Sequence, residues 1–595
     1  MSYLLSRRGA LGLLAAAAAP WSASAAAQAI AGPDADFVAL SAKWLDAMAR
    51  LSPVSATQLG DHRFDNLLDD LSPTGRAAAA ASSRRLLAEL GALPKGSLSR
   101  DNQIDAVILA NQLRYDLWTD EVLESWAWDP LIYNELAGDA LYSVMAREFA
   151  PLTSRLGLAV ARMEKLPAFL SQARRNLKPA RVPLIHAQTL AKQNKGLTSL
   201  IAELITPHAA DLPDSARARL DKATTNLAKA VAEHQAWIDG TLLPNAKGDF
   251  RLGAKLYDEK LAFALNSSLG RKEIRERAEA AVITTRAQMY GLAREVLAGR
   301  ADAPVTPDTP TPVQQQTAIK AAIDLAAADH PAREDVVEAA KSGLAAATAF
   351  VKAKDLITLP DAPVQVILMP EFQRGVAVAY CDAPGALDKK LATFYAVSPI
   401  PDDWTAERTT SFLREYNRRA IDDIATHEAM PGHYVQLAHA NACPSVLRAV
   451  LSNGPFVEGW AVYGESVMAQ EGFLGGDPLY KLVVLKTKLR SITNAILDQA
   501  IHVDGISRED ALRFMMETAF QEEGEASGKW IRASVSSAQL PYYFVGSEEH
   551  WASRREAEKR WGKDFTLKRY HDTVLSFGSP PTRLARAAMF DEPIG

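Results

Sequence analysis

Apolar side chains recur at the spacing of an α-helix along most of the chain. One stripe of an Ala- and Lys-rich segment carries Leu220, Leu227, Val231 and Ile238. This spacing is typical of amphipathic helices that bury one face, and the alanines between the apolar positions have the highest intrinsic helix propensity. The same pattern predicts further helices over residues 36–51, 75–90, 101–122, 156–177, 271–297 and 331–354.

Two kinds of segment interrupt the helical pattern. Residues 303–312 hold four prolines, which lack backbone N–H donors and therefore predict an extended surface loop. Residues 364–369, 376–380 and 392–397 are short, rich in Val, Ile, Phe and Tyr, and bounded by Pro and Gly, so they predict strands. The expected fold is mostly α-helical, with a small sheet just before the segment that carries the candidate chemistry.

Composition and charge are those of an ordinary globular protein. The 595 residues are 48% hydrophobic, and 66 Lys and Arg stand against 71 Asp and Glu, which gives a formal net charge of −5. This balance lacks the basic excess that a nucleic-acid partner requires. The two cysteines, Cys381 and Cys443, exclude a disulfide framework and a cysteine-based zinc finger. Any metal must therefore be held by histidine and carboxylate side chains.

The first 29 residues have the pattern of a secretion signal. Arg7 and Arg8 precede an apolar run over residues 9–19, and small residues follow at Ala27 and Ala29. Paired arginines are typical of the twin-arginine type of signal. An uncleaved anchor helix is the alternative, but the run falls short of the roughly 20 apolar residues that span a membrane. We expect cleavage near residue 29 and a periplasmic or secreted protein with no membrane contact afterwards.

A His-Glu pair begins the candidate metal site. His427 and Glu428 follow a helix-like segment and precede Pro431, Gly432 and His433. Zinc hydrolases place two histidines one turn apart on a helix, with a glutamate beside the first as general base. Here the second histidine comes two residues later, which on an ideal helix lies about 240° away from the first. We expect the proline and glycine to break the helix and return His433 toward His427.

A third metal ligand is expected farther along the chain, because a catalytic zinc needs three protein ligands and an open position. Glu458 and Glu465 lie in an otherwise apolar, aromatic segment and would share one helix face. We predict Glu458 as the third ligand and Glu465 as the acceptor that orients a ligand histidine. One zinc ion per chain is the default, although the same donors also suit manganese, cobalt or iron.

Taken in order, the motifs resemble those of the bacterial family called domain of unknown function 885 (DUF885). The His-Glu-Ala-x-Pro-Gly-His segment over residues 427–433 matches its hallmark, and further matching segments cover residues 52–60, 128–133, 250–253, 458–463 and 571–580. This family is in turn similar to the helical zinc peptidases of the thimet oligopeptidase, angiotensin-converting enzyme and thermostable carboxypeptidase type. Those peptidases keep an uninterrupted His-Glu-x-x-His motif, from which the present chain departs.

The resemblance implies one mostly α, two-lobed metallopeptidase-like domain over residues 30–595. Its lobes would enclose a deep cleft, with the metal-binding segment over residues 400–470. A small antiparallel β-sheet would lie beside the active site, and its edge could pair with an extended peptide. The family element Gln-x-x-x-Tyr-x-x-Gly is matched by Gln539, Tyr543 and Gly546. Tyr543 is the preferred donor to the oxyanion, and Gln539 and Tyr542 are further substrate-binding candidates.

Three arginines are candidates for binding a substrate carboxylate, because the planar guanidinium pairs with a carboxylate through two hydrogen bonds. They are Arg374, Arg490 and Arg532. Such a contact would make the enzyme a carboxypeptidase or dipeptidase. An oligopeptidase is the alternative.

These patterns favour an exported zinc metallopeptidase that hydrolyses peptide bonds of short peptides through a metal-activated water. Glu428 would be the general base that receives the proton of this water. One alternative is a metal-dependent hydrolase of non-peptide amides or esters. Another is a non-catalytic peptide-binding protein, but such a protein has no need of a base beside a ligand histidine.

Overall fold

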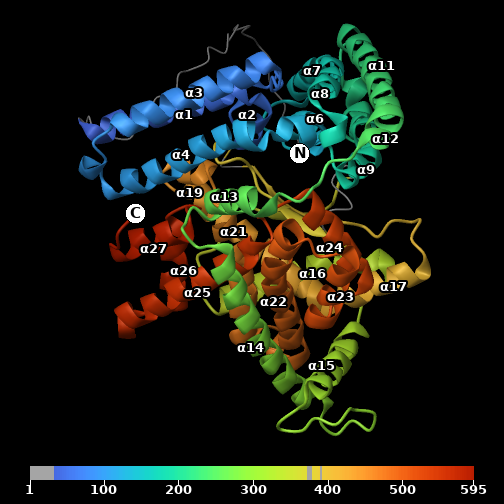
Figure 1. Ribbon diagram of the computed structural model, residues 1–595, viewed down its shortest axis with the longest axis vertical. Coiled ribbons are helices and arrows are strands. Elements are labelled where there is room, and N and C mark those ends of the chain that lie inside the picture. The colour runs from blue at the N-terminus through green and yellow to red at the C-terminus, as the bar shows by residue number, and fades with distance from the viewer. Residues whose placement is uncertain (1–31, 371–377, 389–390, 595) are drawn as a thin grey trace, which may run out of the picture.

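The computed structural model describes residues 32–370, 378–388 and 391–594 (Figure 1). The predicted signal segment over residues 1–29 and the candidate Arg374 lie outside the described residues. Within the described ranges the chain is mostly helical, with a three-stranded sheet. No helix among these residues is both long and apolar enough to cross a bilayer.

The elements follow one another in three stretches of the chain. The first stretch contains α1 Pro33–Leu51, α2 Pro53–Leu59, α3 Pro73–Ala92, α4 Arg100–Trp118, α5 Ser125–Trp128, α6 Leu131–Met145, α7 Leu152–Met163, α8 Leu166–Asn176, α9 Leu184–Gln193, α10 Gly196–Leu200, α11 Asp214–Trp237 and α12 Leu243–Asn245. The second contains α13 Gly253–Leu265, α14 Arg271–Leu297, α15 Pro312–Ala327, α16 Val336–Ala353, β1 Val364–Leu368, β2 Ala379–Asp382 and β3 Thr393–Val397. The third contains α17 Ala406–Glu415, α18 Arg418–Glu428, α19 His433–Ala442, α20 Val446–Val450, α21 Gly454–Gln470, α22 Pro478–Gln499, α23 Arg508–Ala519, α24 Glu523–Val535, α25 Pro541–Trp561, α26 Leu567–Ser576 and α27 Thr582–Phe590.

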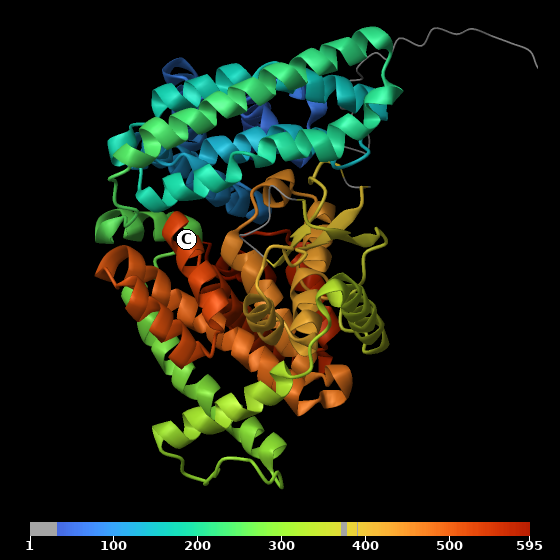
Figure 2. The same cartoon turned by 90° about the vertical axis from the view of Figure 1, so that its right-hand side faces the viewer.

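The helices gather around separate apolar cores. Helices α6 to α11 lie on one side of the molecule (Figure 2) and enclose a core that includes Leu156, Phe169 and Leu227. The larger core on the other side includes Tyr395 of the sheet and Trp460 of α21. Helices α14 and α15 project away from both cores, and the proline-rich segment forms the loop between them, as predicted (Figure 1).

The predicted helices are confirmed, with local changes at prolines and caps. Helix α14 begins and ends at the expected residues. The helix expected over residues 156–177 is divided into α7 and α8, because Pro167 occupies the first turn of a new helix. The helix-like segment before the metal motif is likewise divided into α17 and α18. Asn417 caps α18 by accepting a hydrogen bond from the Ala420 amide at 3.2 Å.

The sheet is mixed, so the prediction of an antiparallel sheet is wrong for one of its two strand pairs. Strand β3 lies in the centre, in the order β1-β3-β2. It pairs antiparallel with β2 and parallel with β1, with Val364 opposite Thr393. The parallel pair arises because the chain passes through β2 before β3 returns beside β1. Strand β2 remains at an edge of this sheet, next to α18.

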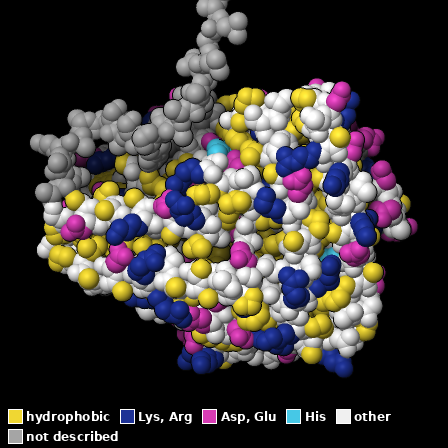
Figure 3. Space-filling view, turned by 90° about the horizontal axis from the view of Figure 1, so that it is seen from above, with side chains coloured by type: hydrophobic (Ala, Val, Ile, Leu, Met, Phe, Trp, Pro, Cys, Tyr) yellow, Lys and Arg dark blue, Asp and Glu magenta, His cyan; other side chains and the backbone are white. Residues whose placement is uncertain are grey.

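Surface charge agrees with the small net charge of the sequence. The face seen in Figure 3 mixes Lys and Arg with Asp and Glu over most of its area.

Candidate metal centre

The chain turns sharply between α18 and α19, where Pro431 and Gly432 predicted a break. Helix α18 ends at Glu428 and α19 begins at His433. The turn returns the second histidine to the first, so that the ring centroids of His427 and His433 lie 4.7 Å apart. The two-residue insertion in the motif is therefore compatible with a shared metal site.

Gly432 is required by close backbone packing. Its φ is −70° and its ψ is −134°, which lies outside both the helical and the extended regions. A Cβ atom at this position would lie 1.8 Å from the carbonyl oxygen of His427. The turn is fixed by the Gly432 amide, which donates to the Thr426 carbonyl at 3.0 Å, and by the Trp460 indole, which donates to the Pro431 carbonyl at 2.8 Å.

We expect Gly432→Ala to lower the free energy of unfolding by about 3 kcal/mol, because the added methyl group overlaps a carbonyl that the turn holds in place. Urea unfolding measures this change. Gly157→Ala in α7 is the matched control, since a Cβ there meets nothing within 4 Å. That variant should be neutral or more stable by up to about 1 kcal/mol. Equal stability of the two variants would contradict the packing argument.

Three side chains from α18, α19 and α21 meet as the predicted ligands. Glu458 Oε2 lies 3.6 Å from His427 Nε2 and 3.4 Å from His433 Nε2. Donor atoms bound to one tetrahedral zinc at 2.0–2.1 Å are about 3.3–3.4 Å apart. Both distances to Glu458 are close to this spacing, and the donor atoms of all three side chains lie within 4.8 Å of one another. Their side chains keep 17%, 11% and 21% exposure in the order His427, His433, Glu458, which leaves one side accessible.

Electrostatics agree with a cluster of ligands. Burial would raise the pKa of Glu458, but hydrogen bonds from His427 and His433 hold that pKa well below its ordinary value. Burial would lower the pKa of His427, but Glu458 and Glu465 together hold it well above the ordinary value. Both directions reflect close attraction between the carboxylates and the imidazoles.

Glu465 lies behind His427, in the position predicted for an orienting residue. Its Oε1 accepts a hydrogen bond from His427 Nδ1 at 2.5 Å, and the carboxylate is 1% exposed. A proton held on Nδ1 leaves the Nε2 lone pair directed toward Glu458 and the metal position. Glu465 and Glu458 share one face of α21, as their spacing predicted.

Asp423 is a buried carboxyl group of this site that the sequence analysis did not single out. It lies one turn before His427 on α18, and burial together with the charge of Glu465 raises its pKa well above the ordinary value. Asp423 lies four residues before His427, and this helical spacing is the signal in the sequence that could have indicated its place in the site.

We expect Glu465→Gln to weaken zinc binding by about 10- to 100-fold, the usual cost of losing a carboxylate behind a ligand histidine. Glutamine keeps an acceptor oxygen but lacks the charge that increases the basicity of the imidazole. Titration with a competing chelator measures the affinity. Glu471→Gln is the control, because Glu471 follows the same helix and pairs only with Lys354, at 3.8 Å, among the described ion pairs. An unchanged affinity in the Glu465 variant would remove its orienting role.

A cavity of 340 Å³ opens beside the ligands. His427, Glu428 and Tyr543 line it, as do Ala379 at the start of β2 and Ser398 after β3. The cavity thus runs between the metal motif and the sheet edge. Glu428 is close enough to the sheet for its charge, after burial, to raise the pKa of the Cys381 thiol in β2.

Tyr543 reaches the site because α25 packs directly on α21. A Cβ at Gly459 would lie 2.4 Å from the Cα of Gly546, so the two helix backbones touch at these glycines. The Tyr543 ring lies 6.4 Å from the His427 ring, centroid to centroid. The Arg532 guanidinium donates to the Tyr543 hydroxyl oxygen at 2.9 Å and to Gln539 Oε1 at 3.2 Å. Three predicted substrate-site residues therefore form one cluster beside the metal ligands.

Tyr542 is directed to another part of the molecule. It lines a separate hollow of 190 Å³ together with Lys260 and Asn453. A Cβ at Gly454 would meet its ring at 2.4 Å, so the ring packs on the start of α21. The structure therefore does not bring Tyr542 together with Tyr543 and Arg532 in the cavity.

The site belongs to a helical protein with a His-His-Glu cluster at the end of a cavity. The family model described as bacterial protein of unknown function (DUF885) matches residues 53–589. The chain therefore belongs to the DUF885 family, as its motifs indicated. No curated protein matches the chain.

Two solved structures share the fold along nearly the whole chain. A candidate lipoprotein of unknown function from Shewanella oneidensis is 34% identical, with a TM-score of 0.76, and the match covers 93% of this chain and 99% of that one. A candidate lipoprotein from Colwellia psychrerythraea is 18% identical, with a TM-score of 0.75 over 94% of this chain and 98% of that one.

Proposed function

We propose that the protein is an exported zinc metallopeptidase that hydrolyses short peptides. The observation that carries this proposal is the cluster of His427, His433 and Glu458, whose donor atoms lie within 4.8 Å of one another beside Glu428 and a cavity. Bound zinc would lower the pKa of a water molecule to about 7 and polarise a carbonyl group. A binding protein would need the cavity but not the glutamate.

Glu428 is the general base of the proposed reaction. It follows a ligand histidine directly in the chain and lines the cavity, while the ligand cluster itself is completed by Glu458. Its carboxylate accepts the proton of the attacking water and later delivers it to the amine that leaves. The carboxylate of Glu465 meanwhile holds His427 in the required tautomer.

Tyr543 is the proposed donor to the oxyanion. Arg532 donates a hydrogen bond to the phenol oxygen, and so the phenol's own proton is directed elsewhere. A free O–H near His427 can donate to the carbonyl oxygen of a substrate as negative charge develops there. Gln539 accepts from the same guanidinium and helps to hold this arrangement.

The cavity and the sheet support a short, extended substrate. A volume of 340 Å³ suits a few residues of peptide and excludes a folded protein. Strand β2 lies at the sheet edge and its first residue, Ala379, lines the cavity. An extended peptide can add to such an edge through main-chain hydrogen bonds, which tolerate many side chains.

Location and architecture support the same proposal. The amino-terminal residues have the pattern of an export signal, and two proteins of the same fold are described as candidate lipoproteins. The separate cores of two groups of helices (Figure 2) support the proposal of a two-lobed shell. The proposed substrate is therefore a peptide outside the cytoplasm.

The direct test is hydrolysis of a library of short synthetic peptides, followed by mass spectrometry. The zinc-loaded protein should cleave peptide bonds, the chelated protein should not, and added zinc should restore cleavage. Cleavage of ester or non-peptide amide substrates alone would replace the proposal by the second kind of hydrolase. If the zinc-loaded protein binds peptides but cleaves none, the alternative of a non-catalytic peptide-binding protein would replace the proposal.

A further inference from the structure

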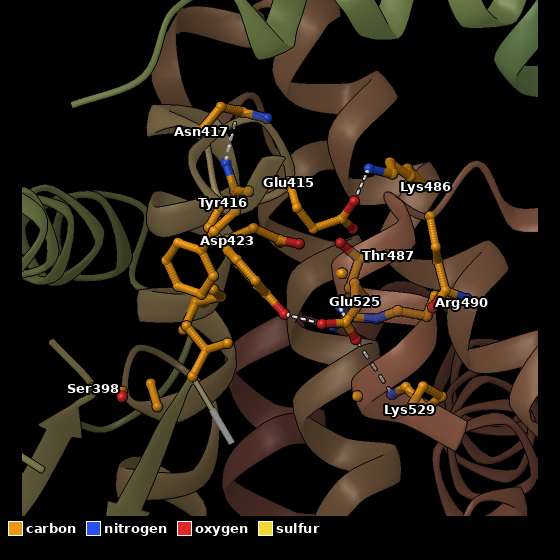
Figure 4. Close-up of a pocket in the computed structure, with 18 of the residues that line it drawn as sticks. Ser398, Glu415, Tyr416, Asn417, Asp423, Lys486, Thr487, Arg490, Glu525 and Lys529 are labelled. Atoms are coloured by element: carbon orange, nitrogen blue, oxygen red, sulfur yellow. Dashed lines mark hydrogen bonds and ion pairs between the residues drawn. The ribbon is translucent and has the colours of Figure 1, made fainter. Parts of the chain in front are cut away.

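The inner part of the cavity holds an unusual number of buried charged groups. Figure 4 shows Glu525 between the hydroxyl of Tyr416 on one side and two cations, Arg490 and Lys529, on the other. Glu525 accepts a hydrogen bond from Tyr416 at 2.6 Å and lies 3.5 Å from Arg490 and 3.7 Å from Lys529. Tyr416 directly follows α17, Arg490 lies on α22, and Glu525 and Lys529 lie on α24, so the cluster joins segments distant in the sequence.

Four cations line this part of the cavity. Lys486, Arg490, Lys529 and Arg532 lie with two glutamates, Glu415 and Glu525, while Glu465 lines the same cavity beside His427. Glu415 is already engaged by Lys486 at 2.8 Å and by the amide of Glu522 at 3.0 Å. Glu525 must therefore serve two cations. Asp423 also lines the cavity, and burial raises the pKa of its carboxyl group.

Arg532 has no carboxylate within ion-pair distance among the residues that the structure describes. Its guanidinium contacts the neutral groups of Tyr543 and Gln539. It is nevertheless close enough to Glu458 for that charge to help raise its pKa. A largely buried guanidinium without a carboxylate partner is costly unless an anion completes its surroundings.

Lys529 shares the carboxylate of Glu525 with Arg490. Its side chain is 7% exposed. Burial lowers its pKa to about 7, the charge of Glu525 opposes this shift, and the charges of Arg490 and Arg532 add to it. The three cations therefore act on one another across a small volume, which an incoming anion would stabilise.

We propose that Arg490, Lys529 and Arg532 form a subsite that binds a carboxylate of the substrate. This inference rests on the proposed function and narrows its substrate class to peptides with a free carboxylate close to the cleaved bond. The subsite lies near the proposed reaction centre, because Arg532 contacts Tyr543 and the ring of Tyr543 lies beside that of His427. The carboxylate comes either from the carboxyl terminus of the peptide or from an Asp or Glu side chain.

Binding can be measured without turnover in the zinc-loaded Glu428→Gln variant. Calorimetry compares three short peptides of one sequence: one with a free carboxyl terminus, one amidated, and one amidated with a glutamate beside the target bond. We expect at least one carboxylate peptide to bind about 10-fold or more tightly than the neutral amidated peptide, because charge-assisted hydrogen bonds are lost in the latter. The peptide that keeps the affinity identifies the source of the carboxylate.

Lys529→Met in the same background should remove most of this preference, and Lys529→Arg should retain it. Thermal unfolding shows whether each variant is folded, and Glu525 keeps Arg490 and Tyr416 as partners when the lysine is lost. Arg408→Gln is the matched control. Arg408 also lines the cavity, but it is exposed and lies over the Trp404 ring at 3.9 Å. This control should keep the preference for carboxylate peptides.

Two outcomes separate this inference from the proposed function. If all three peptides bind equally and the wild-type enzyme cleaves peptides, the proposed carboxylate subsite would be wrong, while the proposed peptidase function would stand. Selective binding of carboxylate peptides without cleavage would support the subsite and overturn the peptidase. A preference unchanged by Lys529→Met in a folded variant would also overturn the subsite.

Discussion

Glu428→Gln is expected to lower kcat for a peptide substrate by about 10³-fold while the chain keeps its zinc. Glutamine matches glutamate in shape but cannot accept a proton, and a general base commonly contributes about 10²- to 10⁴-fold. Glu428 lines the cavity and is not part of the ligand cluster. Steady-state kinetics and elemental analysis of the same preparation measure the two properties separately.

The control for this variant is Glu407→Gln on α17, where the glutamate is exposed. It should keep full activity. Full activity in the Glu428 variant would exclude that residue as the general base. Loss of zinc together with activity would instead show that Glu428 is a metal ligand.

The second large effect concerns the metal itself. The mature protein should contain about one zinc ion per chain after dialysis, and His427→Ala and Glu458→Ala should each contain little or none. Removal of either donor leaves two protein ligands, which hold zinc poorly beside open solvent. Elemental analysis provides this measurement independently of any substrate.

His439→Ala is the matched control, because His439 shares α19 with His433 but lies outside the ligand cluster. Its Nε2 contacts the carbonyl of Thr358 at 2.8 Å. This variant should retain one zinc ion. Retention of zinc in both ligand variants would mean that the metal is held elsewhere, and absence of zinc from the wild type would favour the binding protein.

Local patterns predicted most of the helices and the meeting of the three ligands. Helical periodicity and caps act within a few residues, so α14 and the break before His433 follow from neighbouring residues alone. The shared face of Glu458 and Glu465 is also local, since it depends only on the repeat of one helix.

Features that depend on distant packing were harder to predict. Tyr542 and Tyr543 are adjacent, and only the contact between α25 and α21 decides which of them faces the metal ligands. The sequence also indicated Arg490 and Arg532 without choosing between them. Their common site requires α22 and α24 to line one cavity, and no sequence motif indicated that Lys529 and Glu525 would join them there.

Backbone contact between Gly459 and Gly546 has a mechanical consequence. No side chain separates α21 from α25 at this point, so side-chain rearrangement cannot change the spacing of the two helices there. Glu458 and Glu465 on one helix and Tyr543 on the other should therefore move as a single rigid body. Entry of a peptide and release of its fragments would then depend on displacement of other elements that line the cavity, such as α17.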